Sequence, residues 1–88
     1  MPSVLIRVRM PDPDALSRLI SERSAIRRAS GCRGARLFRD ADDPTQAVFL
    51  MDWDDAALAR EYCESQAVGI ALSEARAELV GVRYLDEL

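Results

Sequence analysis

The segment Gln46–Trp53 constrains the fold of this chain of 88 residues more than any other part of it. Residues Ala47–Met51 are all apolar, whereas a strand with one face in water alternates apolar and polar residues. Successive side chains of a strand point to opposite faces, so Phe49 would lie on one face and Val48 and Leu50 on the other. Both faces of this strand therefore need a cover.

The chain has enough helical segments for only one of these faces. Two segments show the apolar spacing of helices, and each lies between strand patterns. Because these helices are enough to cover one face, the other face needs a different partner, and the same face of a second copy is the simplest one. We therefore expect a homodimer.

The first strand and the first helix are predicted from the N-terminal third of the sequence. Side chains over Val4–Met10 follow the period of two that is typical of a strand. Asp12 then fits the N-cap position of a helix, and Gly31 fits the turn that ends it. The helix is expected to bury Leu16, Leu19, Ile20 and Ile26 and to expose Arg18, Glu22, Arg27 and Arg28.

The remaining sequence predicts two strands, a helix and a last strand. Arginines interrupt Cys32–Arg39, which suits an edge strand, and the turn residues Asp40–Pro44 join it to the apolar strand as a hairpin. Asp54 is predicted to cap the second helix, which Gly69 would interrupt, and Leu79–Leu85 is the final strand. This order predicts an α+β, ferredoxin-like βαββαβ fold with both helices on one face of an antiparallel sheet.

Composition excludes several classes of function. A net charge of −3 argues against a nucleic-acid partner, and the absence of histidine argues against zinc and Ser-His-Asp chemistry. Cys32 and Cys63 are interpreted as reduced thiols, and the acidic pairs near Asp42 and Asp54 as turn and helix-start residues, so we expect no metal. With no apolar run long enough for a bilayer and no signal peptide, we expect one cytoplasmic domain over residues 1–88, without a membrane partner.

Three stretches of the sequence resemble one protein family. They are Gly31–Arg39, Asp42–Pro44 and Phe49–Asp55, the last with Trp53 just before the second predicted helix. Over nearly the whole chain they resemble the dimeric alpha-beta barrel proteins related to antibiotic biosynthesis monooxygenases. The similarity is greatest to small bacterial members described as cyclase-like or uncharacterised, in which a tryptophan ends the third strand. The resemblance implies ferredoxin-like subunits that pair into a dimeric α/β barrel.

The resemblance also implies a range of activities. The superfamily includes oxygenases, haem-degrading enzymes and isomerases, so the fold alone does not choose among them. Haem-degrading relatives use a histidine on the second helix, and quinone-forming relatives without a cofactor use an asparagine together with the tryptophan. This chain has neither residue type. We expect either a cofactor-independent monooxygenase-like or cyclase-like activity, or a noncatalytic dimeric module for binding or assembly whose pocket is filled.

A pocket for a small aromatic or polyketide-like ligand is predicted near Phe49, Trp53, Tyr62, Arg83 and Arg7, with no cofactor. Trp53 either stacks on the ligand or is a core aromatic that holds the helix to the strand. Arg7 and Arg83 lie in strands that should be covered on both sides, where a guanidinium needs an anion. That anion is either a carboxylate or phenolate of the ligand or a carboxylate of the chain. The chain's own candidates are Asp52, Glu78, Asp86 and Glu87.

Overall fold

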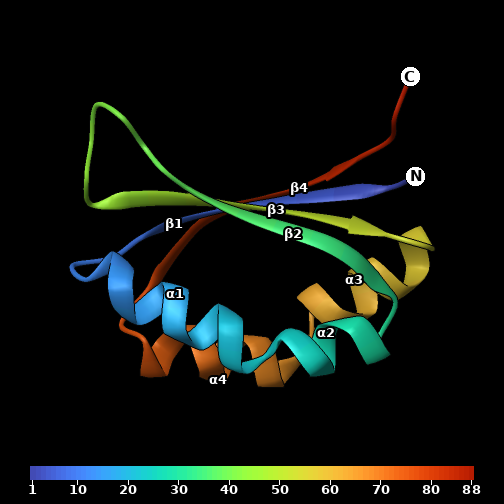
Figure 1. Ribbon diagram of the computed structural model, residues 1–88, viewed down its shortest axis with the longest axis horizontal. Helices are drawn as coiled ribbons and strands as arrows, with labels where there is room; N and C mark the ends of the chain where they lie inside the picture. The colour runs from blue at the N-terminus through green and yellow to red at the C-terminus, as the bar shows by residue number, and fades with distance from the viewer.

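The apolar segment forms an inner strand of a four-stranded antiparallel sheet with the order β2-β3-β1-β4. The computed structural model describes the backbone of residues 1–88 and all their side chains except that of Pro13. The elements are β1 (Ser3–Arg9), α1 (Pro13–Glu22), α2 (Ser24–Ala29), β2 (Cys32–Arg39), β3 (Gln46–Trp53), α3 (Ala56–Cys63), α4 (Gln66–Glu74) and β4 (Glu78–Leu85). All helices lie on one face of the sheet (Figure 1), which confirms the α+β ferredoxin-like fold. The four strands form an open sheet and do not close into a barrel within the described chain.

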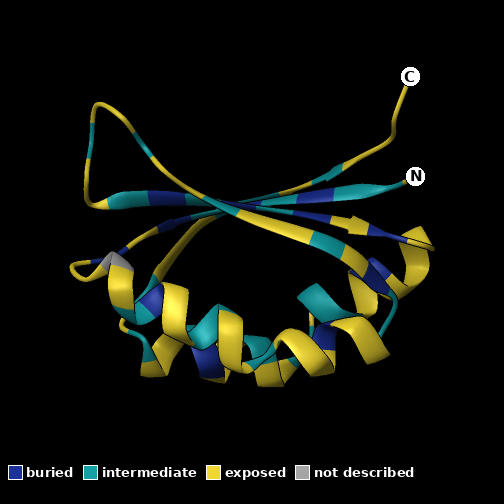
Figure 2. Cartoon of the chain, in the orientation of Figure 1, coloured by how far each residue is buried: buried dark blue, intermediate teal, exposed yellow. Residues whose placement is uncertain are grey.

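The helices cover only one face of the sheet, which we call the inner face. Ile6 and Phe49 are cross-strand partners on this face, and both are buried at no more than 9% exposure. Leu5 and Leu50 are partners on the opposite, outer face and are only half-buried. Figure 2 shows the helices below the sheet and no helix of the described chain above it. The strand that was predicted to need cover on both faces therefore has a cover on one.

The first predicted helix is two helices, α1 and α2, which meet at Arg23. Asp12 caps α1 as predicted, since its carboxylate accepts a hydrogen bond from the backbone N–H of Asp14. The predicted burial at the other end was wrong, because Ile26 is 52% exposed and Arg27 is 6% exposed. On the single helix that the sequence predicts, at about 100° per residue, position 27 would lie about 20° from Leu16 around the axis and position 26 about 80° away. The apolar stripe therefore continues into Arg27.

The second predicted helix is also interrupted, but at a different residue. The break lies between α3 and α4, where the Ser65 hydroxyl caps α4 by accepting from the N–H of Val68. Gly69 lies inside α4, so the prediction that it interrupts the helix was wrong. Asp55 and not Asp54 caps α3, and the carboxylate of Asp54 accepts a hydrogen bond from Nε of Arg33 instead.

Gly31 ends the first helical region, as predicted, and places α3 against it. Its φ of +113° belongs to a backbone region that residues other than glycine rarely adopt. A Cβ at this position would lie 3.1 Å from Cδ1 of Leu58 on α3. The backbone angle therefore favours glycine at this position, and any larger residue would also have to displace the end of the Leu58 side chain.

Candidate ligand site between the sheet and the helices

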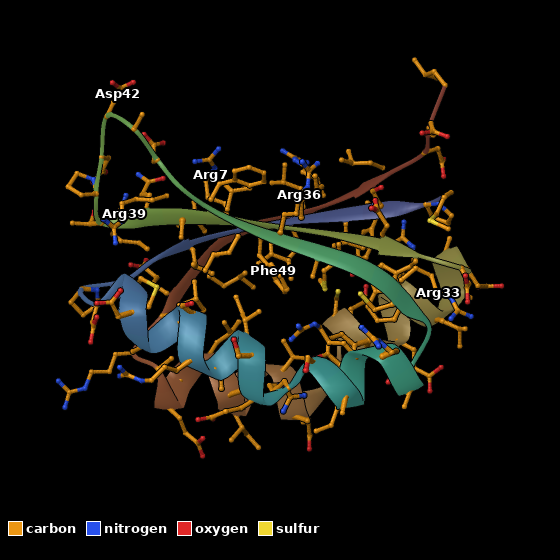
Figure 3. All side chains as sticks on the ribbon, viewed as in Figure 1. Arg7, Arg33, Arg36, Arg39, Asp42 and Phe49 are labelled. Atoms are coloured by element: carbon orange, nitrogen blue, oxygen red, sulfur yellow. The ribbon has the colours of Figure 1, made fainter. Side chains whose placement is uncertain are left out.

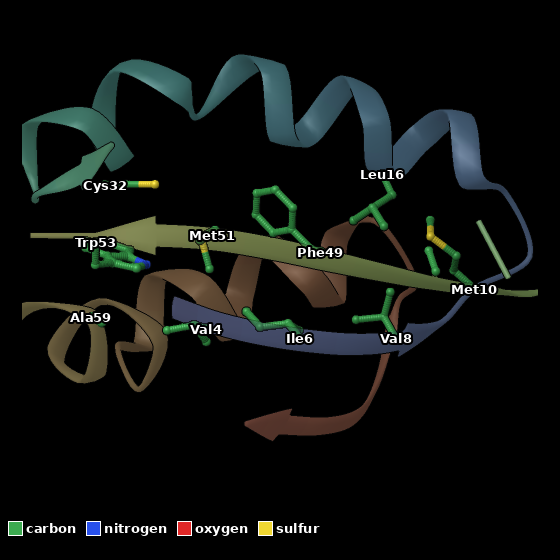
Figure 4. Packing of buried hydrophobic residues seen from close by; sticks show 11 residues of the cluster. Val4, Ile6, Val8, Met10, Leu16, Cys32, Phe49, Met51, Trp53 and Ala59 are labelled. Carbon is green, nitrogen blue, oxygen red and sulfur yellow. The ribbon is translucent and has the colours of Figure 1, made fainter. Parts of the chain in front are cut away.

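An apolar cavity of about 50 Å³ lies between the inner face of the sheet and the helices. Side chains from β1, β3 and all four helical segments or their junctions surround it. They are Ile6, Val8, Leu16, Leu19, Ile20, Arg23, Arg27, Phe49, Met51, Tyr62, Val68, Ala71 and Leu72. Figure 4 shows the ring of Phe49 reaching from β3 toward α1 in the middle of this packing. The strand that constrains the fold therefore also supplies an aromatic wall of the cavity.

Arg27 is a buried charge at the edge of this cavity. Its Nη1 donates a hydrogen bond of 2.6 Å to the carbonyl oxygen of Ile20, and its Cζ lies 5.2 Å from the centroid of the Phe49 ring. Ile20 belongs to the last turn of α1, where carbonyl groups lack helical partners. Among the described residues, no carboxylate lies within ion-pair distance of Arg27. The guanidinium is therefore held by the fold without being neutralised by it.

Tyr62, Arg23 and Trp53 form a second side of the site. Nε of Arg23 donates to the Tyr62 hydroxyl over 3.3 Å, and the guanidinium carbon lies 5.8 Å from the Tyr62 ring centroid. The Tyr62 ring is in turn 5.3 Å from the Trp53 ring. Trp53 is fully buried, and its Nε1 has no hydrogen-bond partner among the described residues. A buried indole N–H ordinarily has an acceptor, so this side contains an unsatisfied donor.

The structure brings three of the five predicted site residues together. Phe49 and Tyr62 line the cavity, and Trp53 packs behind Tyr62 at the end of β3. Trp53 is not among the residues that line the cavity in the described chain. A ligand in the cavity would therefore contact Trp53 only through Tyr62, unless the tyrosine side chain moves.

The other two predicted residues, Arg7 and Arg83, lie on the outer face of the sheet. Figure 3 shows Arg7 on the side of the sheet opposite to Phe49. Nη1 of Arg7 donates to Oε1 of Gln46 at 3.3 Å and lies 3.6 Å from a carboxylate oxygen of Asp40. Arg83 pairs across the sheet with Leu5 and is exposed. Neither guanidinium reaches the cavity, and the carboxylate beside Arg7 is one that the sequence interpretation did not consider.

Arg27 and Arg23 are the site residues that sequence reasoning missed as ligand-binding groups. Arg23 and Arg27 are seven and eleven residues after Leu16, so both follow the apolar stripe of α1. This helical spacing was the available signal. It was overlooked because cations near the end of a helix also stabilise its exposed carbonyl groups from the solvent side.

The two cysteines are free and poorly suited to nucleophilic chemistry. Burial raises the pKa of the Cys63 thiol to about 11, and the nearby Cys32 and Glu64 act in the same direction. Burial also raises the pKa of Cys32, although a backbone hydrogen bond with Gly34 and the charge of Arg27 oppose it. The thiolate is the reactive form, so both side chains are mostly unreactive near neutral pH.

A wider groove of about 550 Å³ lies on the surface between the end of α2 and helix α3. Its charged lining includes Arg33 and Asp54, which pair with each other at 2.6 Å. Because this groove is more polar and its ion pair is already formed, the apolar cavity is the stronger candidate for a ligand site.

Two further features concern metals and membranes. In the part of the chain that the structure describes, no group of three or more cysteine and carboxylate side chains could hold a metal ion. Across the same residues, no helix combines the length and the apolar character needed to cross a bilayer.

Comparison with known proteins places this geometry in a family. Residues 3–71 match the family model described as antibiotic biosynthesis monooxygenase. No curated protein matches the chain. A Mycobacterium tuberculosis structure aligns over 100% of this chain and 96% of its own, with 25% identity and a TM-score of 0.66. SnoaB from Streptomyces nogalater, a cofactor-independent oxygenase, aligns over 99% and 92% at 13% identity and a TM-score of 0.77. The family match covers most of the sequence, and the chain belongs to the antibiotic biosynthesis monooxygenase family.

Proposed function

We propose that this protein is a small homodimer that binds a small aromatic or polyketide-like ligand in the cavity between the sheet and the helices. The observation that carries the proposal is an apolar cavity with aromatic side chains at Phe49 and Tyr62 and a buried guanidinium at Arg27. Apolar walls with a few converging polar groups are typical of sites for small organic molecules.

The uncovered outer face supports the homodimer. Its centre contains Leu5, Val48, Leu50 and Phe38, which we call the outer patch. Three of these side chains are half-buried, and Phe38 is 46% exposed. Arg7 and Arg36 also lie on this face, and the guanidinium carbon of Arg36 is 5.4 Å from the Phe38 ring centroid. Neighbouring apolar groups that are not fully buried are typical of protein interfaces. A second copy that packs its own outer patch here would bury both patches with one symmetric contact.

Any chemistry in the cavity is proposed to need no cofactor. Dioxygen would be the oxidant in an oxygenase, and the ligand itself would supply the electrons. SnoaB, which has the same fold, is a cofactor-independent oxygenase, and this supports the proposal by analogy. A cyclase would use the same cavity to fold a flexible ligand.

A noncatalytic dimeric module is the second candidate, and the size of the cavity favours it. A cavity that holds a benzene ring has about 150 Å³, whereas this one has about 50 Å³. Binding of a ring therefore requires the lining side chains to move. If they do not move, the helices and sheet only form a scaffold for assembly.

Ligand binding can be tested by fluorescence, because Trp53 is the only tryptophan in the chain. A hydroxyanthraquinone and a flavone are titrated into the protein, into an Ala71→Leu variant and into an Ala67→Leu variant. Ala71 is buried in the cavity lining, whereas Ala67 lies on the same helix and is exposed. We expect saturable quenching in the wild type and in Ala67→Leu, and none in Ala71→Leu. Equal quenching in all three proteins, or in none, would contradict a ligand site in this cavity.

Catalysis is tested separately by oxygen consumption. The compound that quenches Trp53 fluorescence is incubated with the wild type and with Ala71→Leu under air, and dioxygen uptake is followed with an electrode. Uptake that depends on the wild-type cavity supports an oxygenase. Binding without uptake or product supports the noncatalytic module.

A further inference from the structure

We propose that Arg27 is the anion-binding group of the cavity and that its ligand is an acidic aromatic molecule with an ionised carboxylate, phenolate or enolate oxygen. This inference rests on the proposed ligand site and adds the chemical class of the ligand. It assigns a role to a side chain on α2, at the opposite side of the sheet from Arg7 and Arg83.

The first argument is the missing counter-ion. Arg27 is 6% exposed, and no carboxylate of the described residues pairs with it. A buried guanidinium without an anion is costly, and removal of water from its charge is repaid only by a close partner. Arg33 illustrates the contrast, because it is exposed and pairs with Asp54 at 2.6 Å. Arg27 is buried and needs an anion more than the exposed Arg33 does, but no carboxylate of the described residues supplies one.

The second argument is the charge of the cavity lining. The chain as a whole is acidic, with 15 acidic and 12 basic residues. The charged residues that line the cavity are nevertheless Arg23 and Arg27, and the described lining includes no aspartate or glutamate. An apolar space with positive charge on its wall favours an anion that carries an apolar body.

The third argument is the geometry of the guanidinium. Nη1 donates to the Ile20 carbonyl, and the Cζ lies 5.2 Å from the Phe49 ring centroid. The Cys32 side chain is a second hydrogen-bond partner of the guanidinium. A guanidinium has five N–H donors in a planar fork, so these two contacts leave donors for an acceptor on a ligand. An aromatic ligand packed against Phe49 would have its acidic substituent beside these donors. The contacts to Ile20 and Phe49 then orient Arg27 in advance.

A purely structural role for Arg27 makes a different prediction. In that case its hydrogen bond to Ile20 would stabilise the end of α1, and its charge would have no importance for ligands. Arg27→Gln removes the charge and keeps an N–H donor, and Arg27→Lys keeps the charge. Arg28→Gln is the matched control, because Arg28 is the exposed neighbour on the same helix.

The test compares two probes of nearly identical shape, a naphthalene carboxylate and its carboxamide. Their dissociation constants are measured at neutral pH by quenching of Trp53 fluorescence and checked by calorimetry. For the wild type, Arg27→Lys and Arg28→Gln, we expect the carboxylate to bind about 10- to 100-fold more tightly than the amide, as for a hydrogen bond to a charged group. For Arg27→Gln, we expect the two probes to bind within about threefold of each other.

The outcomes separate this inference from the proposed ligand site. Equal affinity of the wild type for the two probes would overturn the role of Arg27, and this comparison does not depend on any variant being folded. A carboxylate preference that persists in folded Arg27→Gln, or that is lost equally in Arg28→Gln, would also overturn it. If neither probe nor the larger ring compounds bind to the wild type, the ligand site itself is refuted.

Discussion

Replacement of Phe38 by serine is expected to dissociate the proposed homodimer without unfolding the subunit. Phe38 lies on the outer face of the edge strand β2, opposite Val48, and is 46% exposed in the single subunit. A phenylalanine has about 200 Å² of accessible surface, so about 90 Å² of it is still available to a partner. Complete burial in two symmetric copies removes about 180 Å² from water, which corresponds to about 4.5 kcal/mol. The dissociation constant of the dimer should therefore rise about 10³-fold.

The assay is sedimentation equilibrium over a series of protein concentrations, with the free energy of unfolding measured in parallel. Ile26→Ser is the matched control, because Ile26 is 52% exposed but lies on α2, away from the outer face. The control should leave the dimer unchanged. A monomeric wild type, or equal weakening by both substitutions, would refute the assignment of the outer patch as the interface.

Two further predictions concern the fold and its thiols. Gly31→Ala should lower the free energy of unfolding by at least about 1 kcal/mol, because of the left-handed backbone and the contact with Leu58. Gly69→Ala, in an open position inside α4, should instead raise it by about 0.5 to 1 kcal/mol; urea titrations that show the same sign for both would contradict this assignment. The pKa of Cys63 is raised from 9.0 to about 11 in the fold, so protonation of this thiol favours the folded state. The contribution of the protonated thiol to stability is complete below about pH 9 and is lost as the pH rises toward about 11. A Cys63→Ala variant should not show this loss of stability. Rapid alkylation of native Cys63 at neutral pH would count against the raised pKa.

Patterns that are local in the sequence predicted most of the fold. The apolar run in β3, the alternation in β1 and the turn after β2 each depend on residues close together in the chain, so the order of the elements along the chain and the β2–β3 hairpin followed from them. The signal for two caps, Asp12 and Gly31, was equally local. The start of the second helix was not determined locally, because Asp54 and Asp55 are both good caps and only the contact with Arg33 decides between them.

The site depends on which residues meet across the sheet. The alternation in β1 by itself placed Arg7 on the face of the sheet opposite to that of Ile6. The face on which Arg83 lies depends on the register of β4 against β1, and this register shifts between Arg7 and Val8 of β1. The cavity therefore lacks both arginines that the sequence interpretation assigned to it and contains Arg27 instead.

The sequence by itself determined that one strand would be apolar on both faces, that the fold would be ferredoxin-like and that histidine chemistry was excluded. Only the tertiary structure decided which arginine is buried and left without a carboxylate. The physical reason is that periodicity reports the face on which a side chain lies, whereas the neutralisation of a charge depends on partners far away in the chain. Arg27 and Phe49 are 22 positions apart in the sequence, and only the packing of α2 on the sheet brings them together.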